Sequence, residues 1–133
     1  MMLKQILEDI LKIDDILFVV KNQGAVSEIK NNFLPIRQKD NWITIGDDKG
    51  PCHMHINADN ISKARFVIEE KTERTSYSVM FFDKNDERVL AAFFTKMYDE
   101  NKKLNQKRKS LFDNLFKKYG EQETIVVNQL FTE

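Results

Sequence analysis

Cysteine, histidine, glycine and proline are all scarce in this 133-residue chain. It contains one cysteine, two histidines, four glycines and two prolines. A single cysteine cannot form an internal disulfide, which excludes a disulfide-stabilised secreted scaffold and favours a reducing, cytoplasmic location. Any chemistry that needs soft nitrogen or sulfur donors therefore has very few positions to use.

The chain also lacks an excess of charge of either sign and any long apolar run. Lys and Arg together number 21, as do Asp and Glu, so the net charge is zero. This balance gives no indication of a nucleic-acid partner and slightly favours self-association. No apolar run approaches the roughly 20 residues that span a bilayer. The first apolar segment is broken by Glu8 and Asp9, unlike a signal peptide. We expect a soluble cytoplasmic protein without a membrane partner.

What the chain does contain is the composition of a globular protein. It is 41% hydrophobic and 32% charged and has ten phenylalanines. A length of 133 residues is close to the commonest size of one domain and suffices for an independent core. The sequence therefore predicts a single domain over residues 1–133.

Apolar residues recur with helical spacing at both ends of the chain. The first stripe comprises Leu3, Ile6, Leu7, Ile10 and Leu11, which predicts a helix packed on the core. A second amphipathic helix of roughly 20 residues is predicted from Asp99 to just before Gly120, because glycine commonly follows a helix C-terminus. We interpret its basic face, which includes Arg108, as solvated.

Between the helices the pattern is that of β-strands. The predicted strands are residues 16–20, 25–29, 42–45, 65–69, 76–82 and 88–94, and residues 124–127 are a candidate last strand. The first two flank a turn and predict a hairpin. Residues 65–94 hold three strands joined by short polar turns, which predicts an antiparallel meander. The predicted fold class is α+β: an antiparallel sheet flanked by an N-terminal helix and a long C-terminal helix.

Residues 50–60 concentrate the scarce residue types. They hold Cys52, His53 and His55, which are the only cysteine and both histidines. If residues 52–56 are extended, the two imidazoles point to one face and Cys52 points to the other. A Cys–His nucleophile pair is disfavoured for that reason, and Cys52 is interpreted as a small buried apolar residue.

Three interpretations of the histidine pair are open from the residues alone. Both can be structural or exposed. They can begin a metal site of the kind found in cupin barrels, with Asp59 or a distant carboxylate as third ligand, since such sites need about three protein ligands. One of them can be an axial haem ligand, for which a single imidazole suffices.

Four segments in the second half of the chain carry a further pattern. They are His55-Ile56-Asn57-Ala58-Asp59-Asn60, Ala64-Arg65-Phe66-Val67-Ile68-Glu69, Ser78-Val79-Met80-Phe81-Phe82-Asp83-Lys84-Asn85-Asp86-Glu87 and Phe93-Phe94. In these segments the chain resembles the haem-utilisation family of the ChuX/HutX type, which is related to the two halves of HemS-type haem-handling proteins. The resemblance extends over about residues 14 to 119. Some members place a second histidine before the strand matched by residues 42–45, where this chain reads Gln38-Lys39-Asp40-Asn41.

The resemblance implies a haem carrier or storage protein that assembles as a homodimer, and we assign it no reaction. It implies His55 as the axial ligand, with His53 beside it. Lys63 and Arg65 follow closely in the sequence and are candidate partners of the haem propionates. Two alternatives are kept: a mononuclear metal enzyme with a cupin-like barrel that uses His53, His55 and Asp59, and a ligand-free dimerising domain of the same fold.

Overall fold

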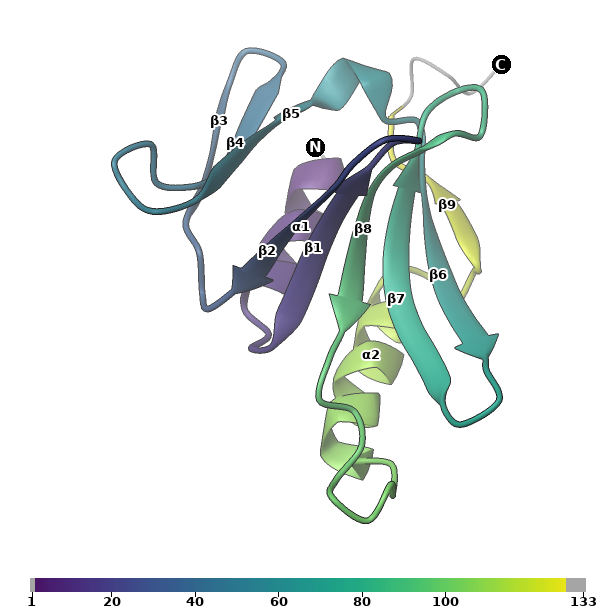
Figure 1. Ribbon diagram of the computed structural model, residues 1–133. Helices are drawn as coiled ribbons and strands as arrows, with labels where there is room; N and C mark the ends of the chain where they lie inside the picture. Colours follow the sequence, from purple (N-terminus) through teal and green to yellow (C-terminus); the bar gives the residue numbers. More distant parts are fainter. Residues whose placement is uncertain (1, 129–133) are drawn as a thin grey trace.

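Two antiparallel sheets and two helices make up the computed structural model, which describes residues 2–128 (Figure 1). The helices are α1 (Met2–Leu11) and α2 (Gln106–Lys118). The larger sheet has the order β2-β1-β8-β7-β6-β9 and the smaller the order β3-β4-β5. The predicted α+β class is confirmed. The predicted domain, residues 1–133, includes residue 1 and residues 129–133, which lie outside the described residues.

The six-stranded sheet is built from hairpins. Its strands are β1 (Ile16–Lys21), β2 (Val26–Asn31), β6 (Lys63–Glu70), β7 (Thr75–Phe82), β8 (Arg88–Phe94) and β9 (Thr124–Val126). The predicted N-terminal hairpin, the three-strand meander and the candidate last strand are all confirmed. Asp86 turns the chain between β7 and β8 with a φ of 63°, a conformation that aspartate tolerates.

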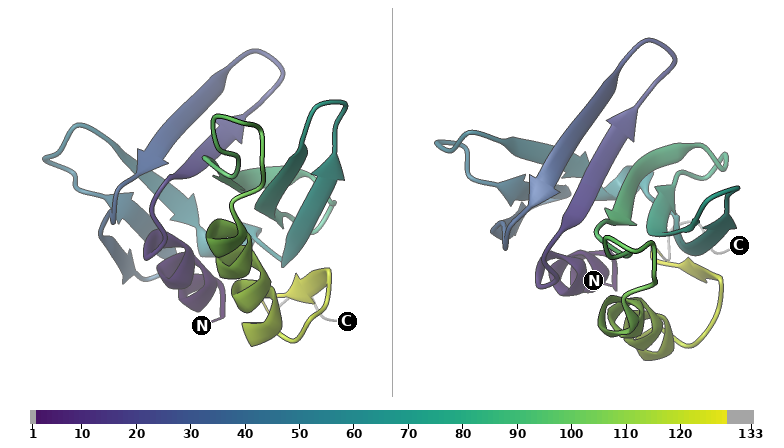
Figure 2. Two further views of the ribbon diagram at one scale, coloured as in Figure 1. Left: turned by 90° about the horizontal axis from the view of Figure 1, so that it is seen from below. Right: turned by 60° about the horizontal axis from the view of Figure 1, so that its bottom comes forward.

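Both helices pack on one face of this sheet, as the two views in Figure 2 show. Phe112 of α2 makes edge-to-face contacts with Phe66, Tyr77 and Phe94, which come from three different strands. The apolar stripe of α1 is fully buried, as its spacing predicted. Neither described helix combines the length and apolar character of a membrane-spanning segment.

Helix α2 is shorter than predicted, and its basic face is not uniformly solvated. It spans 13 residues instead of about 20, because Asn105 caps it by accepting a hydrogen bond from the Arg108 backbone. Arg108 is only 7% exposed. Its guanidinium donates to the Thr95 and Asp14 carbonyls and to the Asp14 carboxylate, which ties α2 to the loop before β1.

The three-stranded sheet carries the histidines. It consists of β3 (Ile36–Lys39), β4 (Trp42–Gly46) and β5 (His53–Asn57), and a short 3₁₀ turn, η1 (Ala58–Asn60), leads from β5 to β6. Ile43, Ile45 and Ile56 are buried and anchor one face of this sheet in the common core. The sequence analysis did not predict β3, which is a short edge strand that begins just after Pro35, as proline in sheets favours.

Candidate functional site

The two histidines project side by side from β5, as the alternation of a strand predicts. In the β4–β5 ladder, His55 lies opposite Thr44 and His53 opposite Gly46. The imidazole centroids are 5.2 Å apart, with ring planes at 67°. Met54 and Ile56 lie on the other face and pack on the core. We call the exposed face with the imidazoles the histidine face.

A buried hydroxyl holds one of the imidazoles. Thr44 is only 5% exposed, and its Oγ1 lies 2.8 Å from His55 Nδ1. In the tautomer with hydrogen on Nδ1, the hydroxyl accepts that hydrogen bond and Nε2 keeps its lone pair free. His55 is therefore oriented as a metal ligand needs to be, with one nitrogen anchored to the fold and the other available.

The loop between β4 and β5 brings a carboxylate to the histidine face. Gly46 begins this loop with a φ of 97°, and a Cβ there would lie 2.5 Å from the Cys52 carbonyl oxygen, so only glycine fits. The loop returns Asp48, whose Oδ1 lies 4.0 Å from Nε2 of both His53 and His55. Arg37 forms a hydrogen-bonded ion pair with Oδ2, and the hydrogen bond from Arg37 lowers the pKa of Asp48.

The carboxylate beside the histidines is thus Asp48 and not Asp59, the residue favoured from the sequence. Asp59 lies in η1, exposed, with its backbone N–H donating to Asn57 Oδ1 at 3.1 Å. The cupin-like barrel is wrong as well, because both sheets of residues 2–128 are open, with β2 and β9 at the edges of the larger one. The sequence alone did not indicate Asp48. Its position follows from the pairing of Gly46 with His53, which closes the β4–β5 loop next to the histidines.

A small cleft runs beside His55 between the two sheets. Its lining is mostly apolar: Val20, Met54, His55, Ile56, Asn57, Asn60, Val89 and Leu90. The volume is about 130 Å³, whereas pockets that enclose drug-sized ligands measure about 300–1,000 Å³. The cleft can hold only part of a large planar ligand, and the remainder would lie outside it.

Cations and an aromatic ring share the histidine face. In the β3–β4 ladder, Arg37 lies opposite Thr44 and Lys39 opposite Trp42, which places all four on the same face as His55. Trp42 is 46% exposed. The sequence analysis missed Arg37 and Lys39 because it did not predict β3, and only the register of that strand assigns them to this face.

The cations chosen from the sequence, Lys63 and Arg65, are engaged elsewhere on β6. Lys63 forms an ion pair with Asp86. The Arg65 guanidinium lies 4.7 Å from the centre of the Phe82 ring and donates to Thr124. Neither residue lines the cleft beside His55. Their assignment to propionates stays a prediction without support from these contacts.

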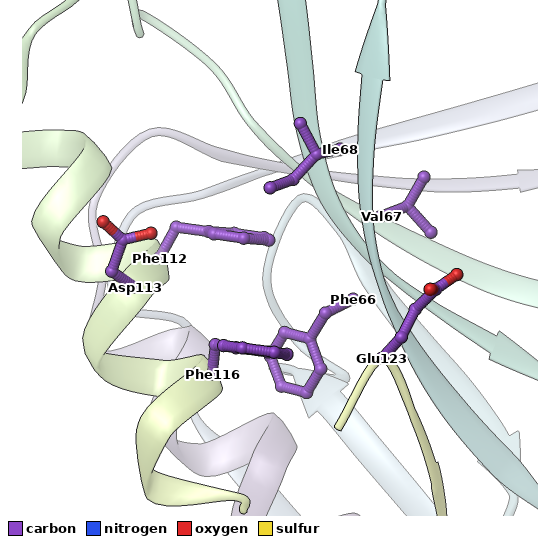
Figure 3. A pocket seen from close by; sticks show the side chains of 7 residues that line it. All are labelled: Phe66, Val67, Ile68, Phe112, Asp113, Phe116 and Glu123. Carbon is purple, nitrogen blue, oxygen red and sulfur yellow. The ribbon is translucent and has the colours of Figure 1, made fainter. Parts of the chain in front are cut away.

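A larger apolar pocket lies between α2 and β6 (Figure 3). It measures about 370 Å³ and is lined by Phe66, Val67, Ile68, Phe112, Asp113, Phe116 and Glu123. None of these side chains offers a nitrogen or sulfur ligand, and its two carboxylates disfavour an anionic ligand. Phe66 also packs edge-to-face on Phe116, with centroids 5.4 Å apart. This pocket is a gap in the aromatic core and lacks the donors of the histidine face.

Comparisons with known proteins agree with this architecture. A protein-family model matches residues 4–120, which is most of the chain. ChuX superposes with a TM-score of 0.77 at 16% identity, over 90% of this chain and 73% of ChuX. A protein of Agrobacterium tumefaciens gives 0.71 at 27% identity, over 85% of this chain and 64% of that one. No curated protein sequence matches significantly.

A longer solved structure matches over one part of its length. ChuS, an Escherichia coli haem oxygenase, superposes with a TM-score of 0.67 at 17% identity. The match covers 85% of this chain but only 34% of ChuS, so this chain spans about a third of that protein. At this identity the likeness concerns the fold alone.

Proposed function

The chain belongs to the haem-utilisation family of the ChuX/HutX type, and we propose that it is a cytoplasmic protein that binds haem for uptake, storage or hand-off. The axial ligand of the iron is His55. The observation that carries this proposal is the position of His55, which borders the apolar cleft while buried Thr44 anchors its Nδ1. ChuX itself is described as a haem-binding protein.

The histidine face offers what the other parts of a haem molecule require. Next to this face, at the edge of β5, the cleft of about 130 Å³ offers an apolar surface that includes Met54 and Ile56 from the opposite face. Trp42 supplies an exposed aromatic ring on the same face. Arg37 and Lys39 supply positive charge for the propionates, which favours them over Lys63 and Arg65 as partners.

An open site of this kind suits a carrier better than an oxygenase. The groups around the distal side of a haem decide whether it is merely bound or activates oxygen. A cleft of about 130 Å³ leaves much of the ligand outside the protein, and a ligand that is exposed on one side can pass to an acceptor. We therefore propose carriage and assign no reaction.

We also propose that the protein acts as a homodimer. A second copy could cover the part of the haem that one chain leaves exposed. The match to about a third of the longer ChuS chain is compatible with this arrangement, since two copies would place two such units together. Light scattering measures the mass: the proposal expects twice the chain mass of 15.7 kDa, and a mass of 15.7 kDa would contradict it.

Titration with hemin tests the haem proposal. We expect a shifted Soret band that saturates at a fixed ratio of hemin to chain. His55→Ala should weaken binding by about tenfold or more, because the iron loses its ligand, and His53→Ala is the matched control that should bind normally.

The outcomes separate the parts of the proposal. A normal Soret shift in His55→Ala would refute the ligand assignment, because the iron would then be held elsewhere. No shift in the unmodified protein would refute haem binding and favour the ligand-free dimerising domain.

A further inference from the structure

We propose that Asp48, His53 and His55 form a binding site for a divalent transition-metal ion, separate in kind from the haem iron. The three side chains come from β5 and the β4–β5 loop. Their donor atoms, one from each residue, all lie within 4.8 Å of one another. All three ligands belong to the chain itself, so the site can be tested on the protein without haem.

The geometry is close to that of a three-ligand site. Asp48 Oδ1 lies 4.0 Å from Nε2 of both histidines. Donors that surround a tetrahedral zinc ion at about 2.0–2.1 Å lie roughly 3.3 Å apart. The donors must therefore approach one another by about an ångström or less on each side, and their partly exposed side chains have room for such a rotation.

The groups behind the donors favour metal binding. Thr44 holds Nδ1 of His55, which leaves Nε2 directed at the site. Asp48 uses its two oxygens differently: Oδ2 pairs with Arg37, and Oδ1 is the oxygen that faces the imidazoles. Arg37 thereby orients the carboxylate without occupying the oxygen that would bind the ion.

The set of donors selects the class of ion. Two imidazoles and one carboxylate suit Zn²⁺, Ni²⁺ or Cu²⁺ and do not suit Mg²⁺ or Ca²⁺, which prefer oxygen ligands. Three protein ligands leave at least one coordination position for water. His55 is shared with the proposed haem site, so a bound metal ion would compete with haem for this side chain.

Calorimetric titration of Zn²⁺ into the haem-free protein, without a polyhistidine tag, tests the site. We expect one ion per chain, with weaker binding by about tenfold or more in both Asp48→Asn and His53→Ala. Asp47→Asn is the matched control from the same loop: an asparagine there still accepts the hydrogen bond from Lys49, and zinc affinity should stay unchanged. Asp59→Asn should also bind normally.

A second readout follows from the scarcity of histidine. The chain has two histidines, so NMR shows one pair of imidazole spin systems, and both should shift together on zinc binding. The proposal would be overturned if Asp48→Asn and His53→Ala bound zinc as tightly as the unmodified protein does. It would also be overturned if zinc left the imidazole signals unmoved. Circular dichroism of each variant distinguishes loss of the site from loss of the fold.

The haem and zinc experiments can fail separately. His53→Ala should lose zinc and keep hemin, whereas His55→Ala should lose both. If hemin does not bind but zinc does, the proposed function fails and the metal site stands. If zinc does not bind and hemin does, only the metal site is refuted.

Discussion

The main aromatic cluster and the candidate ligand site of this protein lie on different sheets. The six-stranded sheet and α2 enclose an aromatic cluster with a gap of about 370 Å³ but no metal-ligating side chain in its lining. The three-stranded sheet has a cleft of only about 130 Å³, yet it borders His55. The comparison teaches that donor atoms, and not the volume of an apolar cavity, locate the candidate site in this fold.

The largest expected effect comes from the aromatic cluster. Phe112 is 2% exposed and contacts rings from three strands. Phe112→Ala should lower the free energy of unfolding by about 3–5 kcal/mol, because it removes apolar contacts and leaves a cavity. Urea denaturation measures this loss. Below the unfolding transition, the hemin affinity of the variant should equal that of the unmodified protein.

A matched substitution on the surface controls for the chemistry of this change. Phe33 is 65% exposed, so Phe33→Ala should change the free energy of unfolding by no more than about 0.5 kcal/mol. Equal losses in the two variants would contradict the role of the Phe112 cluster. A loss of hemin affinity in folded Phe112→Ala would show that the aromatic cluster also contributes to hemin binding, contrary to this comparison.

A smaller effect is expected where the two helices meet. Tyr119, next to α2, donates a hydrogen bond to Asp9 of α1 at 2.6 Å, and Lys118 lies 2.7 Å from the same carboxylate. Burial acts to raise the pKa of Asp9, but the hydrogen bonds from Lys118 and Tyr119 outweigh it and lower the pKa below 3.8. Asp9→Asn should cost about 1–2 kcal/mol of unfolding free energy at pH 7.

The pH dependence gives this prediction its sign. Because the pKa of Asp9 is lowered in the folded state, its contribution is complete above its ordinary pKa of 3.8 and is lost as the pH falls through the folded value. The difference between Asp9→Asn and the unmodified protein should shrink in urea titrations below about pH 4. Glu8→Gln, at a partly exposed pair with Lys4, is the control with a near-zero effect. A difference that persists at low pH would contradict the assignment.

Most elements of the fold could be predicted from the sequence because their patterns are local. The stripe of α1 and the strands of the meander follow periodicity and turn residues alone. Strand β3 was missed because its four residues, Ile36–Lys39, are too few and too polar to show alternation. The predicted helix began too early because Leu104 continues the apolar spacing, whereas in the structure α2 begins after its N-cap residue, Asn105.

The site was only partly predictable, for a different physical reason. Alternation along a strand placed His53 and His55 on one face, and this is confirmed. The other members of the site depend on which strands pair and in which register. Arg37 reaches the histidine face through the β3–β4 ladder, and Asp48 through the turn at Gly46. A single sequence carries no direct signal of such pairings, so nearby residues such as Asp59 and Lys63 were chosen instead.

The smallest expected change in stability should produce a large change in ligand binding. Thr44→Val keeps the volume and the strand preference of residue 44 but removes the hydroxyl that holds His55 Nδ1. The free energy of unfolding should change by less than about 1 kcal/mol, because the partner imidazole is half exposed and water can replace the hydroxyl. Hemin affinity should fall by about tenfold, since groups that orient a metal ligand affect affinity almost as strongly as the ligand does. Thr44→Ser retains a hydroxyl and should restore most of the affinity. If Thr44→Val binds hemin normally, the hydroxyl does not orient His55, and only Trp42 and the cations Arg37 and Lys39 would remain to distinguish the histidine face from the aromatic pocket.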